Sequence, residues 1–175
     1  MKPLAQERGV LAEQRECRRV LFVCTGNTCR SPMAAALLNH LCRSQEVCSA
    51  RGEQAIAPWR GESAGLWAGA GDPISQNAVK SLEQSGVLAT PDNDYPAHRA
   101  RLVTREMMEE ADLVVGITAR HALELTVRFP ECAAKISAFP FDVADPFGGD
   151  LALYRECLMQ LRFGMTLLLP KGDAE

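Results

Sequence analysis

Long apolar runs are absent from this chain of 175 residues. No run approaches the ~18 residues that a membrane-spanning helix needs. The N-terminal segment 1–19 carries four arginines but lacks the apolar stretch of a secretion signal. A surplus of basic residues is also absent, since the net charge is −3 and the pI is about 5.7. We therefore expect a cytoplasmic protein whose partners are neither nucleic acids nor membranes.

Metal-binding patterns are absent as well. The chain has seven cysteines but no Cys-x-x-Cys pair, and its three histidines, His40, His98 and His121, are far apart in the sequence. Structural zinc sites use closely spaced pairs of such ligands, so we predict no metal and no cofactor. An odd number of scattered cysteines without an export signal indicates reduced thiols. His40 and His121 fall on predicted helices, and neither is assigned a function.

Composition and length indicate one globular domain. Hydrophobic residues make up 47% of the chain and charged residues 23%, which excludes intrinsic disorder. No internal repeat or low-complexity linker interrupts the sequence. We expect a single domain at residues 19–169, preceded by a mobile N-terminal tail (1–18) and followed by a short C-terminal tail (170–175).

Short apolar runs alternate with amphipathic patterns along the predicted domain. The predicted strands are 20–23, 62–66, 113–117 and 136–139, with a further candidate at 100–103. The predicted helices are 32–42 (with Ser31 as N-cap), 72–85, 105–110, 118–129 and 150–168. This alternation predicts a parallel sheet covered by helices on both faces. Ligands of such sheets bind at the carboxyl ends of the strands, so we expect chemistry in the loop after the first strand.

That loop reads CTGNTCRS and runs from Cys24 to Ser31. Backbone N–H groups at a helix N-terminus bind anions, and Gly26 and Asn27 tolerate the backbone that curls such a loop around a phosphate. Arg30 can bind two phosphate oxygens at once. A thiolate of Cys24 would be stabilised in the same field and would face the phosphorus. The pattern therefore predicts a cysteine nucleophile inside a phosphate-binding loop.

Residues 20–34, VLFVCTGNTCRSPMA, resemble the signature of the low molecular weight protein tyrosine phosphatases. The resemblance covers residues 19–169 and continues in four further segments: 63–65, 98–101, 111–114 and 145–149. It implies a three-layer α/β sandwich with a four-stranded parallel sheet and helices on both faces. It also implies two-step hydrolysis of a phosphorylated protein through a phosphocysteine. The loop sequence Thr-Gly-Asn-Thr most resembles that of the bacterial protein arginine phosphatases of this family.

Three residues carry the reaction that the resemblance implies. Cys24 is the nucleophile, and Arg30 holds the phosphoryl oxygens. Asp145, which precedes a proline near the last helix, matches the general acid that protonates the leaving group. Asp142 is the alternative acid, although we expect it to be a solvated turn residue.

The other site residues form three groups under the same resemblance. The phosphate-binding loop comprises Thr25, Gly26, Asn27, Thr28, Cys29, Arg30 and Ser31. The residues that brace this loop are Asn27, Ser31, Ser63 and His98. The residues that line the substrate cleft are Thr28, Trp67 and Phe147. In addition, Cys29 lies near the nucleophile along the loop, so we predict that it traps an oxidised nucleophile as a disulfide.

Phosphoarginine in proteins is the favoured substrate, because Thr28 stands where tyrosine-directed members often have isoleucine and brings a hydroxyl to the pocket. Phosphotyrosine is the alternative, since Trp67 and Phe147 can accept a neutral ring as well as a guanidinium. A thiol-dependent arsenate reductase is a remote alternative. Such enzymes pass electrons from the loop to further cysteines that lie close together, whereas Cys132 and Cys157 are far apart in this sequence. A silent phosphoprotein-binding module is disfavoured because no catalytic residue is replaced.

Overall fold

The computed structural model describes residues 17–49 and 59–168. Within them, four parallel strands form one sheet in the order β2-β1-β3-β4. The strands are β1 (Arg18–Cys24), β2 (Trp59–Gly65), β3 (Leu113–Gly116) and β4 (Ile136–Ala138). The helices are α2 (Arg30–Ser49), α3 (Gln76–Gln84), α4 (Arg105–Glu110), α5 (Ala119–Arg128) and α6 (Leu151–Leu168), with 3₁₀ turns η1 (Tyr95–Ala97) and η2 (Pro130–Lys135). The predicted tails lie outside the described residues apart from residues 17 and 18, and β1 already begins at Arg18.

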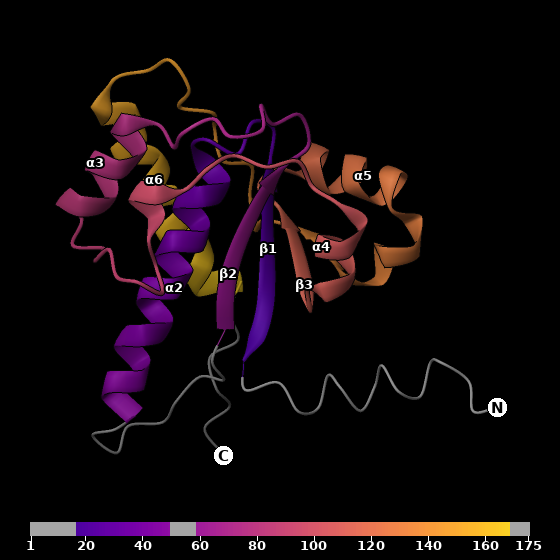
Figure 1. Cartoon of the computed structure of the whole chain (residues 1–175), viewed down its shortest axis with the longest axis horizontal. Coiled ribbons are helices and arrows are strands. Elements are labelled where there is room, and N and C mark those ends of the chain that lie inside the picture. The colour runs from indigo at the N-terminus through magenta and orange to yellow at the C-terminus, as the bar shows by residue number, and fades with distance from the viewer. Residues whose placement is uncertain (1–16, 50–58, 169–175) are drawn as a thin grey trace.

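Helices cover both faces of the sheet (Figure 1). Helices α2, α3 and α6 lie on one side, and α4 and α5 lie on the other. Val20 and Phe22 of β1 belong to the core on the first side, whereas Leu21 and Val23 belong to the core on the second. Alternate residues of a strand point to opposite faces, so a strand covered on both faces is one continuous apolar run. The predicted three-layer sandwich is confirmed.

Two helices differ from their predicted bounds by more than two residues. Helix α2 continues to Ser49 rather than ending at 42, since no glycine or proline follows to stop it. Helix α3 begins at Gln76 rather than at Asp72. Two backbone hydrogen bonds join the segment around Asp72 to Ala100: the Gly71 N–H donates to the Ala100 carbonyl, and the Ala100 N–H donates to the Asp72 carbonyl. These bonds hold the segment in a turn, so the helix begins only after it.

The candidate strand 100–103 is not a strand in the structure. It forms one isolated parallel bridge, between Leu102 and Gly65 at the end of β2. The Gly65 N–H donates to the Arg101 carbonyl, and the Val103 N–H donates to the Gly65 carbonyl, both at 2.9 Å. The segment therefore pairs only with the last residue of β2, too briefly to form a ladder.

The predicted N-cap of α2 is also wrong. Ser31 lies inside the first turn, because the Met33 N–H donates to the Cys29 carbonyl at 3.1 Å and helical bonding starts two residues earlier than predicted. The Ser31 hydroxyl instead donates to the Ala64 carbonyl of β2 at 3.2 Å. This side chain is therefore held at the loop rather than at a helix cap.

The predicted starts of two other helices are confirmed. Thr104 Oγ1 accepts the N–H of Met107 at 3.3 Å, and Thr118 Oγ1 accepts the N–H of His121 at 3.2 Å. These N-cap bonds satisfy backbone donors that the helix itself leaves free. Of the helices in the described part of the chain, none is both long and apolar enough to cross a membrane.

Candidate active site

The sulfur of Cys24 lies at the carboxyl end of β1, and the residue is 3% exposed. The Asn27 N–H donates to this sulfur at 3.3 Å, and Ser31 Oγ lies 3.1 Å from it. The donated N–H of Asn27 favours a charged sulfur, and the N-terminus of α2 adds positive potential at the same place. The surroundings of Cys24 therefore suit a thiolate nucleophile.

Asn27 holds the curl of the phosphate-binding loop. Its φ of 56° is left-handed, and it is the one non-glycine with positive φ in the described residues. Its side chain donates to Ser31 Oγ (2.9 Å) and Ser63 Oγ (3.0 Å) and accepts the Arg101 N–H (3.0 Å). His98 Nε2 lies 2.9 Å from the Asn27 carbonyl oxygen, and burial lowers the pKa of this imidazole. These bonds offset the strain of the left-handed backbone, and they bring the four predicted bracing residues together.

The end of β2 packs directly against the loop. A Cβ on Gly65 would lie 2.7 Å from the Thr25 carbonyl oxygen, so the close approach requires glycine. The next two residues continue the contact, because the Leu66 N–H donates to Cys24 O and the Trp67 N–H donates to Thr25 O, each at 2.9 Å. The chain that leaves β2 therefore runs directly along the edge of the phosphate-binding loop.

Arg30 and Asp145 form an ion pair at the site, with Nη2 and Oδ2 2.8 Å apart. Arg30 Nη1 also donates to the Val143 carbonyl at 3.2 Å, while its buried Nε has no acceptor in the structure. A guanidinium binds phosphate through parallel N–H groups, so Arg30 keeps donor capacity for an oxyanion. The Phe147 N–H donates to Asp145 Oδ1 at 3.2 Å and helps to fix the carboxyl at the cleft.

Asp142, the alternative acid, does not line the cleft. Its Oδ1 accepts the N–H of Ala119, the first residue of α5, at 2.7 Å. A carboxylate is stabilised at a helix N-terminus. Asp142 is exposed, as expected of a solvated residue, and its carboxylate also connects the segment before Asp145 to α5.

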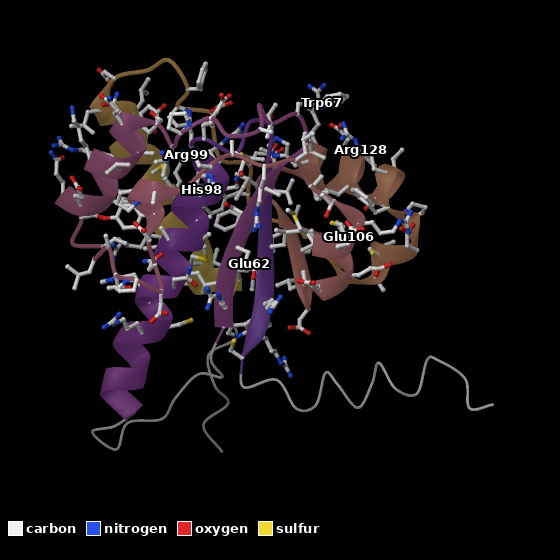
Figure 2. The ribbon with its side chains drawn as sticks, viewed as in Figure 1. Glu62, Trp67, His98, Arg99, Glu106 and Arg128 are labelled. Carbon is white, nitrogen blue, oxygen red and sulfur yellow. The ribbon has the colours of Figure 1, made fainter. Side chains whose placement is uncertain are left out.

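A cleft of about 290 Å³ opens at the loop, lined by the loop residues 24–30 and by Trp67, Gly69, Asp72, Asp145 and Phe147. Trp67 is 68% exposed and Phe147 is 74% exposed, so both predicted walls present their rings to solvent. The Arg128 guanidinium lies 4.2 Å from the Trp67 ring and donates to the Leu66 carbonyl at 3.0 Å (Figure 2). This cation–π contact restrains an otherwise exposed indole. Sequence analysis did not find Arg128.

Cys29, the predicted redox partner, is buried beneath the loop. Its sulfur lies 3.2 Å from Tyr154 Oη, which also accepts a hydrogen bond from Ser75 Oγ at 2.9 Å. Burial raises the pKa of the Cys29 thiol and raises the pKa of Tyr154 to about 12. Both groups are therefore protonated at neutral pH. The sequence pattern places Tyr154 on the apolar face of the helix predicted at 150–168, which gives no sign of a polar contact.

His121, which received no function from the sequence, also contacts the loop. Its Nε2 lies 2.9 Å from Thr25 Oγ1, and its Nδ1 lies 3.0 Å from Thr118 Oγ1. The residue is 6% exposed, and burial lowers the pKa of the ring to about 4, with the positive charge of Arg30 acting in the same direction. The helical pattern of α5 shows that one face is buried but not which loop that face meets.

The chemistry available at the loop is that of the cysteine-dependent phosphatases, in which a thiolate attacks a phosphoryl group held by backbone amides and a guanidinium. Within residues 17–49 and 59–168, no group of three or more His, Cys, Asp or Glu side chains could hold a metal ion. Residues 19–172 match the low molecular weight phosphotyrosine protein phosphatase family, and the chain belongs to this family. It is a hydrolase, a protein phosphatase. The predicted resemblance is thereby confirmed.

Individual relatives carry two kinds of name. The chain is 38% identical over 165 residues to a protein-arginine-phosphatase of Geobacillus stearothermophilus, covering 90% of this chain and 97% of that relative. It is 30% identical over 158 residues to the probable low molecular weight protein-tyrosine-phosphatase EpsP of Ralstonia nicotianae, covering 88% and 95%. Among solved structures, a YwlE arginine phosphatase mutant with a phosphorylated active-site serine in place of cysteine has a TM-score of 0.69, 29% identity and coverage of 86% and 92%.

Proposed function

We propose that the chain removes the phosphoryl group from phosphoarginine residues of proteins, through a phosphocysteine formed on Cys24. The observation that carries the proposal is the Cys24 sulfur within hydrogen-bond distance of the Asn27 N–H and Ser31 Oγ, at the N-terminus of α2. The substrate assignment is supported by Thr28, which lines the cleft, and by the similarity to a protein-arginine-phosphatase.

The reaction has two balanced steps. In the first, the Cys24 thiolate attacks phosphorus, the P–N bond of phosphoarginine breaks, and Asp145 gives its proton to the leaving guanidino nitrogen. Arg30 and the loop amides hold the three phosphoryl oxygens during this transfer. In the second, the Asp145 carboxylate takes a proton from water, the water oxygen attacks phosphorus, and the S–P bond breaks to release phosphate and the Cys24 thiolate.

The ion pair between Arg30 and Asp145 gives substrate binding a second effect. A phosphoryl group that takes both parallel N–H groups of Arg30 competes with Asp145 for Nη2, which lies 2.8 Å from Oδ2. Binding therefore frees the Asp145 carboxyl from Arg30, so that it can face the leaving group instead.

Thr28 sets the substrate preference in this proposal. Thr28 lines the cleft and its Oγ1 lies 3.6 Å from the Cys29 sulfur, whereas an isoleucine would offer only methyl and methylene groups. One hydroxyl contact is worth about 1–1.5 kcal/mol, or roughly tenfold in specificity. Phosphotyrosine is the second candidate, and the exposed rings of Trp67 and Phe147 favour it because they can stack on a neutral aromatic group.

An arsenate reductase is supported less well. Such a reductase needs further cysteines that can receive electrons from the loop. Cys157 belongs to the core on the α6 side of the sheet, whereas Cys132 belongs to the core on the opposite side. A sheet therefore separates the two cysteines that would have to form a relay.

The substrate proposal is tested with matched peptides that carry phosphoarginine or phosphotyrosine at the same position. Wild type should have the higher kcat/KM on phosphoarginine. Thr28→Ile should shift the ratio toward phosphotyrosine by at least tenfold, and Thr28→Val separates loss of the hydroxyl from added bulk. A wild type that already prefers phosphotyrosine, or a ratio that Thr28→Ile leaves unchanged, would overturn the assignment.

We also propose a cytoplasmic setting with phosphorylated proteins, rather than nucleic acids or membranes, as partners. The odd number of cysteines, scattered along the chain, supports a reducing compartment. Cys29 is proposed as the resolving thiol. Peroxide would oxidise the Cys24 thiolate to a sulfenic acid, and the Cys29 sulfur would displace its oxygen as water to form a disulfide.

A further inference from the structure

His121 is a buried imidazole for which the two reaction steps have no use. It lies in the first turn of α5 and contacts one hydroxyl with each ring nitrogen, Thr118 at Nδ1 and Thr25 at Nε2. Thr25 immediately follows the nucleophile and lines the cleft. His121 therefore connects the start of α5 to the residue next to Cys24.

One placement of the protons satisfies all the hydrogen bonds around this ring. Thr118 Oγ1 accepts the backbone N–H of His121 at 3.2 Å, so its own proton is available for Nδ1 of the same ring, 3.0 Å away. With Nδ1 as acceptor, a neutral imidazole carries its proton on Nε2 and donates it to Thr25 Oγ1. The low pKa of the ring, about 4, is consistent with this neutral form.

The proton of Thr25 is then left for a ligand. Oγ1 already accepts from His121, and no other side chain or backbone group in the described residues pairs with it. The side chain is exposed at the cleft. A hydroxyl whose oxygen accepts from a buried donor keeps its own proton for another acceptor, and the cleft that Thr25 lines is the space open to such an acceptor.

We propose that His121 is a positioning residue that orients the Thr25 hydroxyl as a hydrogen-bond donor to the phosphoryl group of the substrate. The inference rests on the proposed function, since it requires the phosphoryl group to bind in the loop that begins at Cys24. Arg30 and the loop amides supply the other donors. Thr25 adds a hydrogen-bond donor that is neutral, so it places no further charge next to the Cys24 thiolate.

The test compares variants of His121 that keep or lose a donor nitrogen at the position of Nε2. The amide nitrogen of glutamine can take the place of Nε2, whereas the shorter asparagine can replace only Nδ1. His121→Asn and Thr25→Val should each lower kcat/KM for para-nitrophenyl phosphate about tenfold or more, since a hydrogen bond to a charged group is worth about 1.5–3 kcal/mol. Each should raise the inhibition constant of inorganic vanadate by a similar factor. His121→Gln should restore most of the loss.

Epistasis separates positioning from general support of the fold. If His121 acts through Thr25, then His121→Asn should cost almost nothing further in a Thr25→Val background. Thr126→Val, a hydroxyl loss on the same helix away from the cleft, should leave the kinetics unchanged. Additive losses in the double variant would overturn the inference. Wild-type kinetics of the Thr25→Val variant would overturn it as well. This variant should fold, because the substituted side chain is exposed.

Failure of the proposed function gives a different result. If wild type does not hydrolyse para-nitrophenyl phosphate, or if Cys24→Ser keeps the activity, then the phosphatase chemistry at this loop is wrong. If wild type is active, Cys24→Ser is inactive and the Thr25 and His121 variants match wild type, then only the positioning role is wrong.

Discussion

Acidification from about pH 7 to about pH 5 should destabilise the folded chain through His121. Burial holds the pKa of this ring at about 4 in the folded state, whereas an unfolded histidine titrates near 6.5. Between these values the unfolded state binds a proton that the folded state excludes, so unfolding becomes more favourable as the pH falls. The stabilisation is fully present above about pH 6.5 and is lost toward pH 4.

The size of the effect follows from the two pKa values. Linkage gives a loss of about 2 kcal/mol in the free energy of unfolding between about pH 7 and pH 5 from this group alone. Urea unfolding of wild type and His121→Gln at a series of pH values measures it, because glutamine does not titrate. His98, whose pKa burial also lowers, contributes equally to both proteins and cancels in the difference. Parallel curves for the two proteins would refute a neutral, buried His121.

Further predictions concern activity. Asp145→Asn should lower the rate on a substrate with a poor leaving group by ~10²–10⁴, while Asp142→Asn should lose less than tenfold because that carboxylate bonds to α5. After peroxide treatment, wild type should recover activity with dithiothreitol and Cys29→Ser should not; equal recovery would assign the resolving role elsewhere. Arg128→Ala should raise KM a few-fold with little change in kcat, since it frees the indole of Trp67. The same substitution should have no effect in a Trp67→Ala background, and an undiminished effect there would contradict that role.

The fold was largely predictable from the sequence because its signals are local. The run at 20–23 is buried on both faces, and the helices predicted from 105 and 118 begin at Arg105 and Ala119. The prediction was wrong where tertiary pairing overrides local pattern. Asp72 begins no helix because its backbone is bonded to Ala100, a residue that the local sequence around Asp72 cannot indicate.

The same distinction applies to the site. Asn27, Ser63 and His98 come together as the family resemblance implies, since the loop motif fixes their partners. His121 and Arg128 were not found, because each acts at the site only through the direction in which α5 crosses the end of the sheet. A helical pattern gives the buried face of α5, but the loop that this face meets depends on the packing of the whole domain.

The most direct test of the central claim is a rapid-mixing experiment with Asp145→Asn and para-nitrophenyl phosphate. Its good leaving group needs little help from an acid, so transfer to the enzyme stays fast while hydrolysis of the phosphoenzyme is slowed. We predict a burst of about one nitrophenolate per enzyme and a phosphoryl group that mass spectrometry maps to Cys24. Steady turnover without a burst, or a phosphoryl group on any other residue, would contradict the claim.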